Sequence, residues 1–374
     1  MGASMDLPSD ENWRVLLSLL PRDWQNLALH FGAIERLRGF DSAEAVLRTL
    51  LFHVGKGYSL RESAVQARLA GVASVSDVTI LNRLRQAGPW FQRMCQLLLE
   101  ESGVTLPDGP AGRHVRVLDG TLVQEPGRTG SSWRIHYSIR LPSLLCDHLE
   151  LTSTRGQGTG EILHRFPASQ GDLILADRGF CTPVGIEALR EQGADVIVRW
   201  KSSSLPLYTP EGKPFALLPE LSQLTEPQQV GDWPVTIRGR RQRWTGRLIA
   251  LRKSEAATRR ARKKIQRKAQ QGGPQTKPET LEYAAYVILF TTLPAEQFSG
   301  AQVLEWYRLR WQIELVFKRL KTLAQLGHLP KEEPDSARSW LYGKLLVALL
   351  AQKLIRVGRS ISPWGYLLSP QTQR

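Results

Sequence analysis

Cysteine is scarce in this sequence, and its scarcity excludes the classes of fold that depend on it. The 374 residues contain three cysteines, Cys95, Cys146 and Cys181. An odd number at such wide spacing argues against a disulfide framework and against a thiolate metal site. The composition therefore predicts a protein of the reducing cytoplasm.

Long hydrophobic runs are also missing. The run Leu345–Ala351 near the C-terminus is far shorter than the roughly 20 apolar residues that cross a bilayer. The opening residues, MGASMDLPSDENW, show neither the basic start nor the apolar stretch of a secretion signal. No Walker-type phosphate loop and no G-x-S-x-G nucleophile elbow occurs. We therefore expect a globular protein with no membrane partner.

Acidic residues are outnumbered, and the imbalance is uneven along the chain. Lys and Arg number 50 against 35 Asp and Glu, which gives a net charge of +15. Residues 201–374 hold 29 of the basic residues and only 13 of the acidic ones. A positive field of this kind favours a polyanionic partner, whose phosphates would dominate the affinity.

The first hundred residues carry the signals of short helices. Serines in capping positions predict helices at 43–53, 59–70 and 77–85, opened by Ser42, by the capping box of Ser59 and Glu62, and by Ser76 or Asp77. The last two helices flank Gly71, which suggests a helix-turn-helix-like unit with Arg83 and Arg85 on its second helix. A plain helical packing module fits equally well, because this region has no net positive charge.

The pattern changes to that of an α/β sheet after a linker at residues 102–112. Alternating residues predict strands at 115–124, 133–141 and 146–152, and then a short buried strand at 172–177, a helix at 183–192 and a strand at 196–200. Three antiparallel-looking strands followed by strand–helix–strand indicate a sheet with helices on its faces.

Residues 201–283 interrupt that pattern with repeated prolines and a high density of positive charge. Strands of a small β subdomain are predicted at 235–237 and 244–251. Next comes a run with seven positive charges in ten residues, 259–268. Such a run is often a solvated helix, but its place inside the sheet region favours nucleic-acid contact by Arg259, Arg260, Lys263 and Lys264.

Three acids stand out by position. Asp119 and Asp177 end strand-like runs, and Glu314 lies in Val303–Leu323, which we expect to be one continuous helix. On a helical wheel Tyr307, Arg310, Glu314 and Lys321 share an arc of roughly 60° beside an apolar face. On spacing alone, Arg310 and Glu314 would form an ordinary solvated ion pair. Two acids from strands and one from a helix are, however, what a divalent-metal phosphoryl-transfer site needs.

These residues resemble the motifs of a known family. Tyr307-x2-Arg310-x3-Glu314-x6-Lys321 matches the Tyr-Arg-Glu-Lys motif of the bacterial insertion-sequence DDE transposases called insertion-sequence family four. Asp119-Gly-Thr and Asp177-Arg-Gly-Phe are similar to the first and second catalytic aspartate segments of that family. The resemblance covers about residues 110–325.

The resemblance implies a ribonuclease H-like catalytic core in an α/β fold. The core would comprise residues 109–200 and 284–330, interrupted by the basic, mainly β insertion at 201–283. An N-terminal all-helical domain at 1–108, possibly DNA-binding in this family, and a C-terminal helical segment at 331–374 would flank it.

The resemblance also implies a chemistry. Asp119, Asp177 and Glu314 would be catalytic and would hold two Mg²⁺ ions, with Mn²⁺ as a substitute. We hypothesise that Asp119 bridges the two ions. Tyr307, Arg310 and Lys321 would contact DNA phosphates.

The activity implied is cleavage at the terminal inverted repeats of a mobile element and strand transfer into target double-stranded DNA. A homodimer would form the synaptic complex, in the bacterial cytoplasm at the nucleoid. Two alternatives stay open: a non-catalytic DNA-binding protein descended from a transposase, and another ribonuclease H-like nuclease. The histidines at 114, 136, 148 and 164 lack close ligand spacing, so we expect them to be structural.

Overall fold

The structure is a computed structural model. It describes residues 10–101, 112–124, 131–156, 158–271, 277–327, 329–330 and 333–359. Nearly all of the predicted 102–112 linker lies outside these residues. So do residues 125–130 and the chain after residue 359. No helix in the described ranges is both long and apolar enough to cross a membrane.

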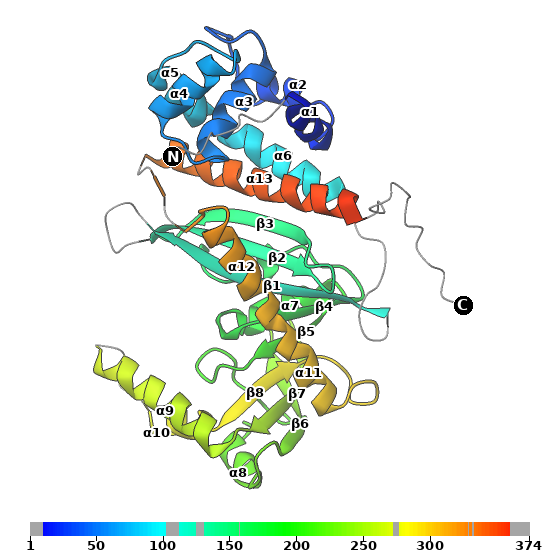
Figure 1. Cartoon of the computed structure of the whole chain (residues 1–374). Coiled ribbons are helices and arrows are strands. Elements are labelled where there is room, and N and C mark those ends of the chain that lie inside the picture. Colours follow the sequence, from blue (N-terminus) through cyan, green and yellow to red (C-terminus); the bar gives the residue numbers. More distant parts are fainter. Residues whose placement is uncertain are drawn as a thin grey trace.

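One eight-stranded sheet runs through the middle and lower parts of the molecule (Figure 1). Its strand order is β3-β2-β1-β4-β5-β8-β7-β6. The strands are β1 (His114–Gln124), β2 (Ser131–Arg140), β3 (Cys146–Ser153), β4 (Asp172–Ala176), β5 (Asp195–Arg199), β6 (Val230–Arg238), β7 (Arg243–Arg252) and β8 (Tyr286–Thr291). Each predicted strand is present, with ends that shift by a few residues.

The type of strand pairing changes twice across the sheet, from antiparallel to parallel and back to antiparallel. β3, β2 and β1 form antiparallel pairs, whereas β1, β4 and β5 are parallel. β8, β7 and β6 then continue in antiparallel fashion from β5. The strands predicted within residues 201–283 therefore extend the central sheet through β8, instead of forming a sheet of their own.

Alternation along the strands divides the buried residues between two cores. Leu173 and Leu175 of β4 belong to a core shared with the helices at the N- and C-terminal ends of the chain. Ile174 and Ala176 belong to a second core on the other face, which is covered by α7 (Pro183–Glu191) and α8 (Leu217–Ser222). Because β4 is buried on both faces, its sequence is a continuous apolar run, as expected for a central parallel strand.

Residues 10–101 form helices, and the predicted caps are confirmed. Ser42 and Ser76 each accept a hydrogen bond from a backbone N–H of the helix that they open, and Ser59 with Glu62 forms the capping box. The helices are α1 (Asp10–Leu19), α2 (Trp24–His30), α3 (Ala43–Val54), α4 (Leu60–Leu69), α5 (Asp77–Gln86) and α6 (Gly88–Glu101).

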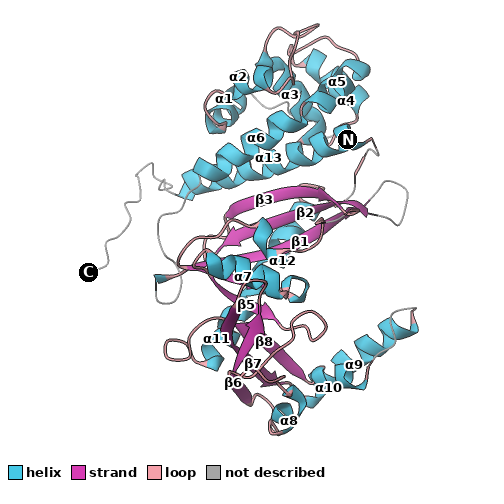
Figure 2. Ribbon diagram, turned by 180° about the vertical axis from the view of Figure 1, so that it is seen from behind, coloured by secondary structure: helices cyan, strands magenta, loops and turns pink. Residues whose placement is uncertain are grey.

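The last helix returns to this group. α13 (Pro334–Arg359) lies alongside α6, between the N-terminal helices and β3 (Figures 1 and 2). Its buried side chains include Trp340, Leu341 and Tyr342. The predicted C-terminal segment therefore does contain a helix, and this helix packs against helices from the opposite end of the chain.

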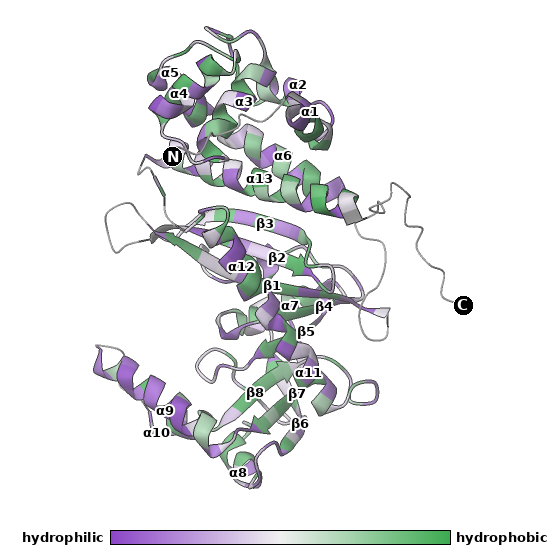
Figure 3. Ribbon diagram, viewed as in Figure 1, coloured by the Kyte–Doolittle hydropathy of each residue, from purple (hydrophilic) through white to green (hydrophobic). Residues whose placement is uncertain are grey.

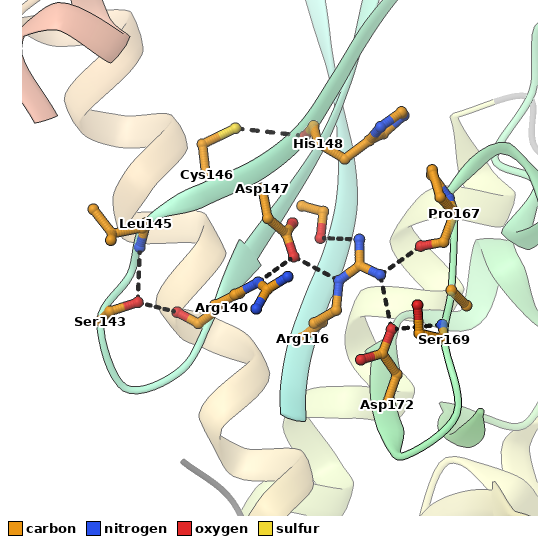
Figure 4. A network of polar contacts seen from close by, with 12 residues as sticks. Arg116, Arg140, Ser143, Leu145, Cys146, Asp147, His148, Pro167, Ser169 and Asp172 are labelled. Carbon is orange, nitrogen blue, oxygen red and sulfur yellow. Dashed lines mark hydrogen bonds and ion pairs between the residues drawn. The ribbon is translucent and has the colours of Figure 1, made fainter. Parts of the chain in front are cut away.

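A buried ion network ties four strands together (Figure 4). Arg116 of β1 is 5% exposed, and its Nε lies 2.7 Å from Asp147 of β3. Its Nη1 lies 3.1 Å from Asp172 at the start of β4 and donates to the Pro167 carbonyl. Asp147 also pairs with Arg140 of β2 at 3.1 Å. This network fixes the position of β1 three residues before Asp119.

Candidate active site

Asp119 and Asp177 are brought together by the pairing of β1 with β4. The two strands are parallel neighbours, and Val117 lies opposite Leu175. Asp119 and Asp177 stand two residues beyond this pair, so they occupy equivalent places on adjacent strands. Asp177 caps the short 3₁₀ helix η3 (Arg178–Phe180) by accepting a hydrogen bond from the Gly179 N–H at 2.7 Å.

The electrostatics of Asp119 suit a cation. Burial, together with the charge of Asp177, raises the pKa of Asp119 to about 7. The N–H of Gly120 donates to its carboxylate at 2.7 Å and lowers the pKa in part, as does the charge of Arg310. Ionising this carboxylate costs free energy in the free protein. A positive ion bound beside it would therefore strongly stabilise the ionised form.

The segment that carries Glu314 is not the single helix that we expected. It consists of α11 (Gly300–Arg308), a 3₁₀ turn η4 (Leu309–Trp311) and α12 (Gln312–Thr322). Neither glycine nor proline occurs in residues 303–323, so no local signal predicted the break. The tighter turn coincides with the contact of Arg310 with Asp119, and 3₁₀ turns inside helices often mark functional sites.

Arg310 joins the helical segment to the sheet. Its Nη1 lies 3.5 Å from Oδ2 of Asp119, and its Nη2 donates to Oε1 of Glu314. The ion pair expected from the spacing of Arg310 and Glu314 is therefore present, but the same guanidinium also reaches the acid on β1. One cation thus lies between two of the three predicted acids.

The fit of these residues to divalent ions rests on their donor chemistry. Among the described residues, no three His, Cys, Asp or Glu side chains stand close enough to hold an ion as they lie. The oxygen donors Asp119, Asp177 and Glu314 nevertheless match the hard ligands that Mg²⁺ prefers. The Arg310 guanidinium between Asp119 and Glu314 shows that a positive group is accommodated there.

Tyr307 lies close enough to Arg310 and Asp177 for their charges to act on its hydroxyl. Burial raises the pKa of its hydroxyl to about 12, and the charges of Arg310, Arg199 and Asp177 act on it. It is therefore a neutral hydrogen-bonding group beside the site. Lys321, in the last turn of α12, is exposed and does not join this cluster in the structure.

Comparison with known proteins identifies the family. The model of the family described as "Transposase DDE domain" matches residues 153–350. The Escherichia coli transposase of insertion sequence IS421 is 34% identical over 95% of this chain and 97% of its own length. InsL of IS186A from Escherichia coli K12, also named as a transposase, has the same identity and coverage. This chain is an insertion-sequence DDE transposase.

A structural neighbour was also found. The fold aligns with a piggyBac transposase in a synaptic complex with hairpin DNA, at a TM-score of 0.45 and 11% identity. The alignment covers 97% of this chain and 75% of that one. The family assignment rests on the sequence relatives.

The basic run of the transposase forms a separate surface. Arg259, Arg260, Lys263 and Lys264 lie on α9 (Glu255–Gln270), which has no buried residue. α9 projects from the end of the molecule that is opposite the N-terminal helices, and it is hydrophilic along nearly its whole length (Figure 3). The structure therefore does not bring these four residues to the acids.

Sequence reasoning missed a group of cations beside Asp177. Arg178 follows it directly, Arg199 ends β5, and Lys253 follows β7. Burial, followed by the charges of Arg199 and Arg178, lowers the pKa of Lys253 to about 8. No carboxylate pairs with these three cations among the residues that the structure describes, whereas buried Arg116 and Arg247 both have acidic partners. Only the sheet order brings them together, so no motif could have predicted the group.

A fourth acid, Glu161, was also missed. It lies between β3 and the 3₁₀ helix η2 (Leu163–Arg165), and its charge acts on Asp119. It belongs to none of the family segments recognised in the sequence. Its place beside the aspartates depends on the path of a loop.

Other predicted features have structural roles. Arg83, on α5, is buried and donates to the Arg36 carbonyl, and Arg85 pairs with Glu333 at 3.3 Å. The second helix of the unit at 60–86 therefore does not present both arginines to a ligand. His136 is fully buried, with Nε2 2.8 Å from the Thr152 hydroxyl, in agreement with the expectation of a structural histidine.

Proposed function

We propose that this transposase cleaves DNA at the terminal inverted repeats of its element and joins the ends to target DNA at one site. The site would consist of Asp119, Asp177 and Glu314. The observation that carries the proposal is the equivalent placement of Asp119 and Asp177 on neighbouring parallel strands, with Glu314 linked to Asp119 through Arg310.

The catalytic part would be a ribonuclease H-like core. Its basis is the strand order β3-β2-β1-β4-β5, in which an antiparallel meander is followed by two parallel strands. Residues 201–283 would then be the insertion, and β6, β7 and α9 would extend the core towards DNA. The helices of residues 1–108 and the segment 331–374 would form the flanking parts.

Two Mg²⁺ ions, or Mn²⁺ in their place, would be held by Asp119, Asp177 and Glu314. When bound, such ions supply an activated attacking oxygen and stabilise the leaving oxygen of a phosphodiester. Arg310 would break its ion pairs with Asp119 and Glu314. Its guanidinium would then bind a DNA phosphate, since this group suits bidentate phosphate contact. Tyr307 would donate its hydroxyl to the backbone, and Lys321 would add a point charge.

The DNA itself would lie across cations on two parts of the molecule. Arg178, Arg199 and Lys253 would receive the backbone beside the acids, and α9 would contact it farther away. Two ends held together require at least a homodimer, acting in the cytoplasm at the nucleoid.

The test is a cleavage assay with labelled DNA that carries the ends of the element, in Mg²⁺ or EDTA. Asp119→Ala, Asp177→Ala and Glu314→Ala should each abolish cleavage and leave most of the DNA binding. Glu305→Ala, which removes an exposed acid of α11, is the matched control and should cleave normally. Full activity in any of the three variants would remove that residue from the site.

The same assay separates the alternatives. Binding without cutting in Mg²⁺ or Mn²⁺ would indicate a non-catalytic DNA-binding protein. Cutting without joining to target DNA would indicate a ribonuclease H-like nuclease that lacks strand transfer.

A further inference from the structure

Glu161 reaches the two aspartate segments from a third direction. Its carboxylate packs against Gly120, the residue after Asp119, and against Gly179, two residues after Asp177. A Cβ added to Gly120 would lie 3.7 Å from Oε1 of Glu161. A Cβ added to Gly179 would overlap with Oε2. The carboxylate thus occupies space that only glycine at position 179 leaves open.

Its position is electrostatically costly. Burial and then the charge of Asp177 raise the pKa of Glu161, and the charge of Glu161 in turn raises the pKa of Asp119. Arg134 and Lys201 offset part of this cost. In the described parts of the chain, no hydrogen bond or ion pair holds its carboxylate, whereas Glu150 of β3 pairs with Arg165 at 2.5 Å.

A carboxylate placed among like charges is destabilised unless a positive partner offsets the repulsion. Arg134, whose charge acts on Glu161 more than that of Lys201, donates instead to the Thr159 carbonyl at 3.2 Å. Lys201 is exposed and forms no ion pair with Glu161 among the described residues. The remaining candidate is the divalent ion for which Asp119 and Asp177 are proposed as ligands. We infer that Glu161 is a fourth carboxylate of the catalytic centre and helps to hold that ion between the β1 and β4 segments. This inference rests on the proposed function.

The experiment measures metal binding directly, with Mn²⁺ as the probe and no DNA present. Titration calorimetry and Mn²⁺ paramagnetic resonance would compare the full-length wild type with Glu161→Gln and Glu161→Asp. Glu150→Gln, which removes an acid of β3 that already has a basic partner, is the matched control. We expect the Mn²⁺ Kd to rise about tenfold or more in Glu161→Gln and to be unchanged in Glu150→Gln.

A second readout guards against a merely structural effect. If Glu161 is repelled by its neighbours, Glu161→Gln should melt at the same or a higher temperature than the wild type in EDTA. The rise in melting temperature on adding Mn²⁺ should be smaller in Glu161→Gln. Glu161→Asp keeps the charge on a shorter stem and should lie between the two.

The outcomes are distinct. Unchanged Mn²⁺ affinity in Glu161→Gln would overturn the inference while leaving the proposed function intact, provided that the wild type still cleaves in Mg²⁺. A lower melting temperature in EDTA with unchanged Mn²⁺ affinity would assign Glu161 a structural role. A wild type that neither binds Mn²⁺ nor cleaves would overturn the proposed function, and this inference with it.

Discussion

Arg116→Met should destabilise the sheet that carries the two aspartates. The substitution keeps a side chain of similar length and removes the charge at the centre of the buried network (Figure 4). Asp147 and Asp172 would then remain buried without their shared partner. Breaking a buried ion pair by removing one partner costs about 3–5 kcal/mol, because a charge is left uncompensated.

The surrounding contacts place the expected cost at the lower end of that range. Asp147 keeps Arg140 at 3.1 Å, and Asp172 still accepts from the Ser169 N–H at 3.0 Å. We therefore expect a loss of about 3 kcal/mol in the free energy of unfolding. The chain has 374 residues. At an unfolding entropy of about 2.1 cal/mol/K per residue, that loss corresponds to a fall of roughly 4 °C in melting temperature.

The assay is urea and thermal unfolding followed by circular dichroism. Arg61→Met is the control, because its pair with Asp77 is exposed and should contribute less than about 1 kcal/mol. Adding Asp172→Asn to Arg116→Met should restore part of the loss, since one unpaired charge is removed. A free energy of unfolding for Arg116→Met within about 1 kcal/mol of wild type would refute the reasoning.

Three further predictions concern DNA and pH. Replacing all four α9 residues, Arg259, Arg260, Lys263 and Lys264, by Ala should weaken binding to any DNA sequence and reduce the slope of log affinity against log salt by up to about 3.6; an unchanged slope would exclude α9 from the interface. Lys321→Ala should weaken binding to element ends and lower the slope by about 0.9, measured by fluorescence anisotropy at several salt concentrations. Burial, followed by the charges of Arg165, Arg134 and His148, lowers the pKa of His136 to about 3, against about 6.5 when unfolded. Its native state therefore binds fewer protons, so stability should fall as pH drops below 6.5, by up to about 1.4 kcal/mol per pH unit. His136→Gln should show a shallower fall in urea titrations, and equal slopes would contradict the assignment.

Much of the local structure followed from short-range chemistry. Ser42, Ser59 and Ser76 opened helices where their hydroxyls could cap them, because capping depends on residues only three positions apart. The strands were predictable because alternation along a strand reflects its two faces. Asp119 and Asp177 were recognised because each follows or ends an apolar run.

The features that were missed depend on contacts between distant segments. The break at Leu309–Trp311 coincides with the reach of Arg310 to Asp119, 191 residues earlier. The joining of β6 and β7 to the central sheet depends on the pairing of β8 with β5. Glu161 approaches the site on a loop whose path no periodic pattern records. Local propensity carries no information on such pairings.

The sheet order also explains how one edge can both repel and attract a polyanion. β8 is antiparallel to β5 and β7, so β7 runs parallel to β1, β4 and β5. The carboxyl ends of these four strands therefore lie at the same end of the sheet. Asp119 and Asp177 lie on β1 and after β4, whereas Arg199 and Lys253 lie at the ends of β5 and β7. Charge thus changes from negative at Asp119 and Asp177 to positive at Arg178, Arg199 and Lys253.

Such an arrangement would place DNA binding and the cleavage chemistry at different positions on the sheet. A carboxylate cluster repels a phosphodiester unless cations intervene, and isolated cations would hold the DNA without positioning it for chemistry. Under the proposed function, the DNA backbone would be bound by cations that begin directly after Asp177 and continue on the neighbouring strands, while the adjacent phosphate would reach the acids. Arg310 stands at the boundary, paired with Asp119 and Glu314 in the free protein. Under the proposed function, Arg310 would therefore have to change partners when DNA and metal bind.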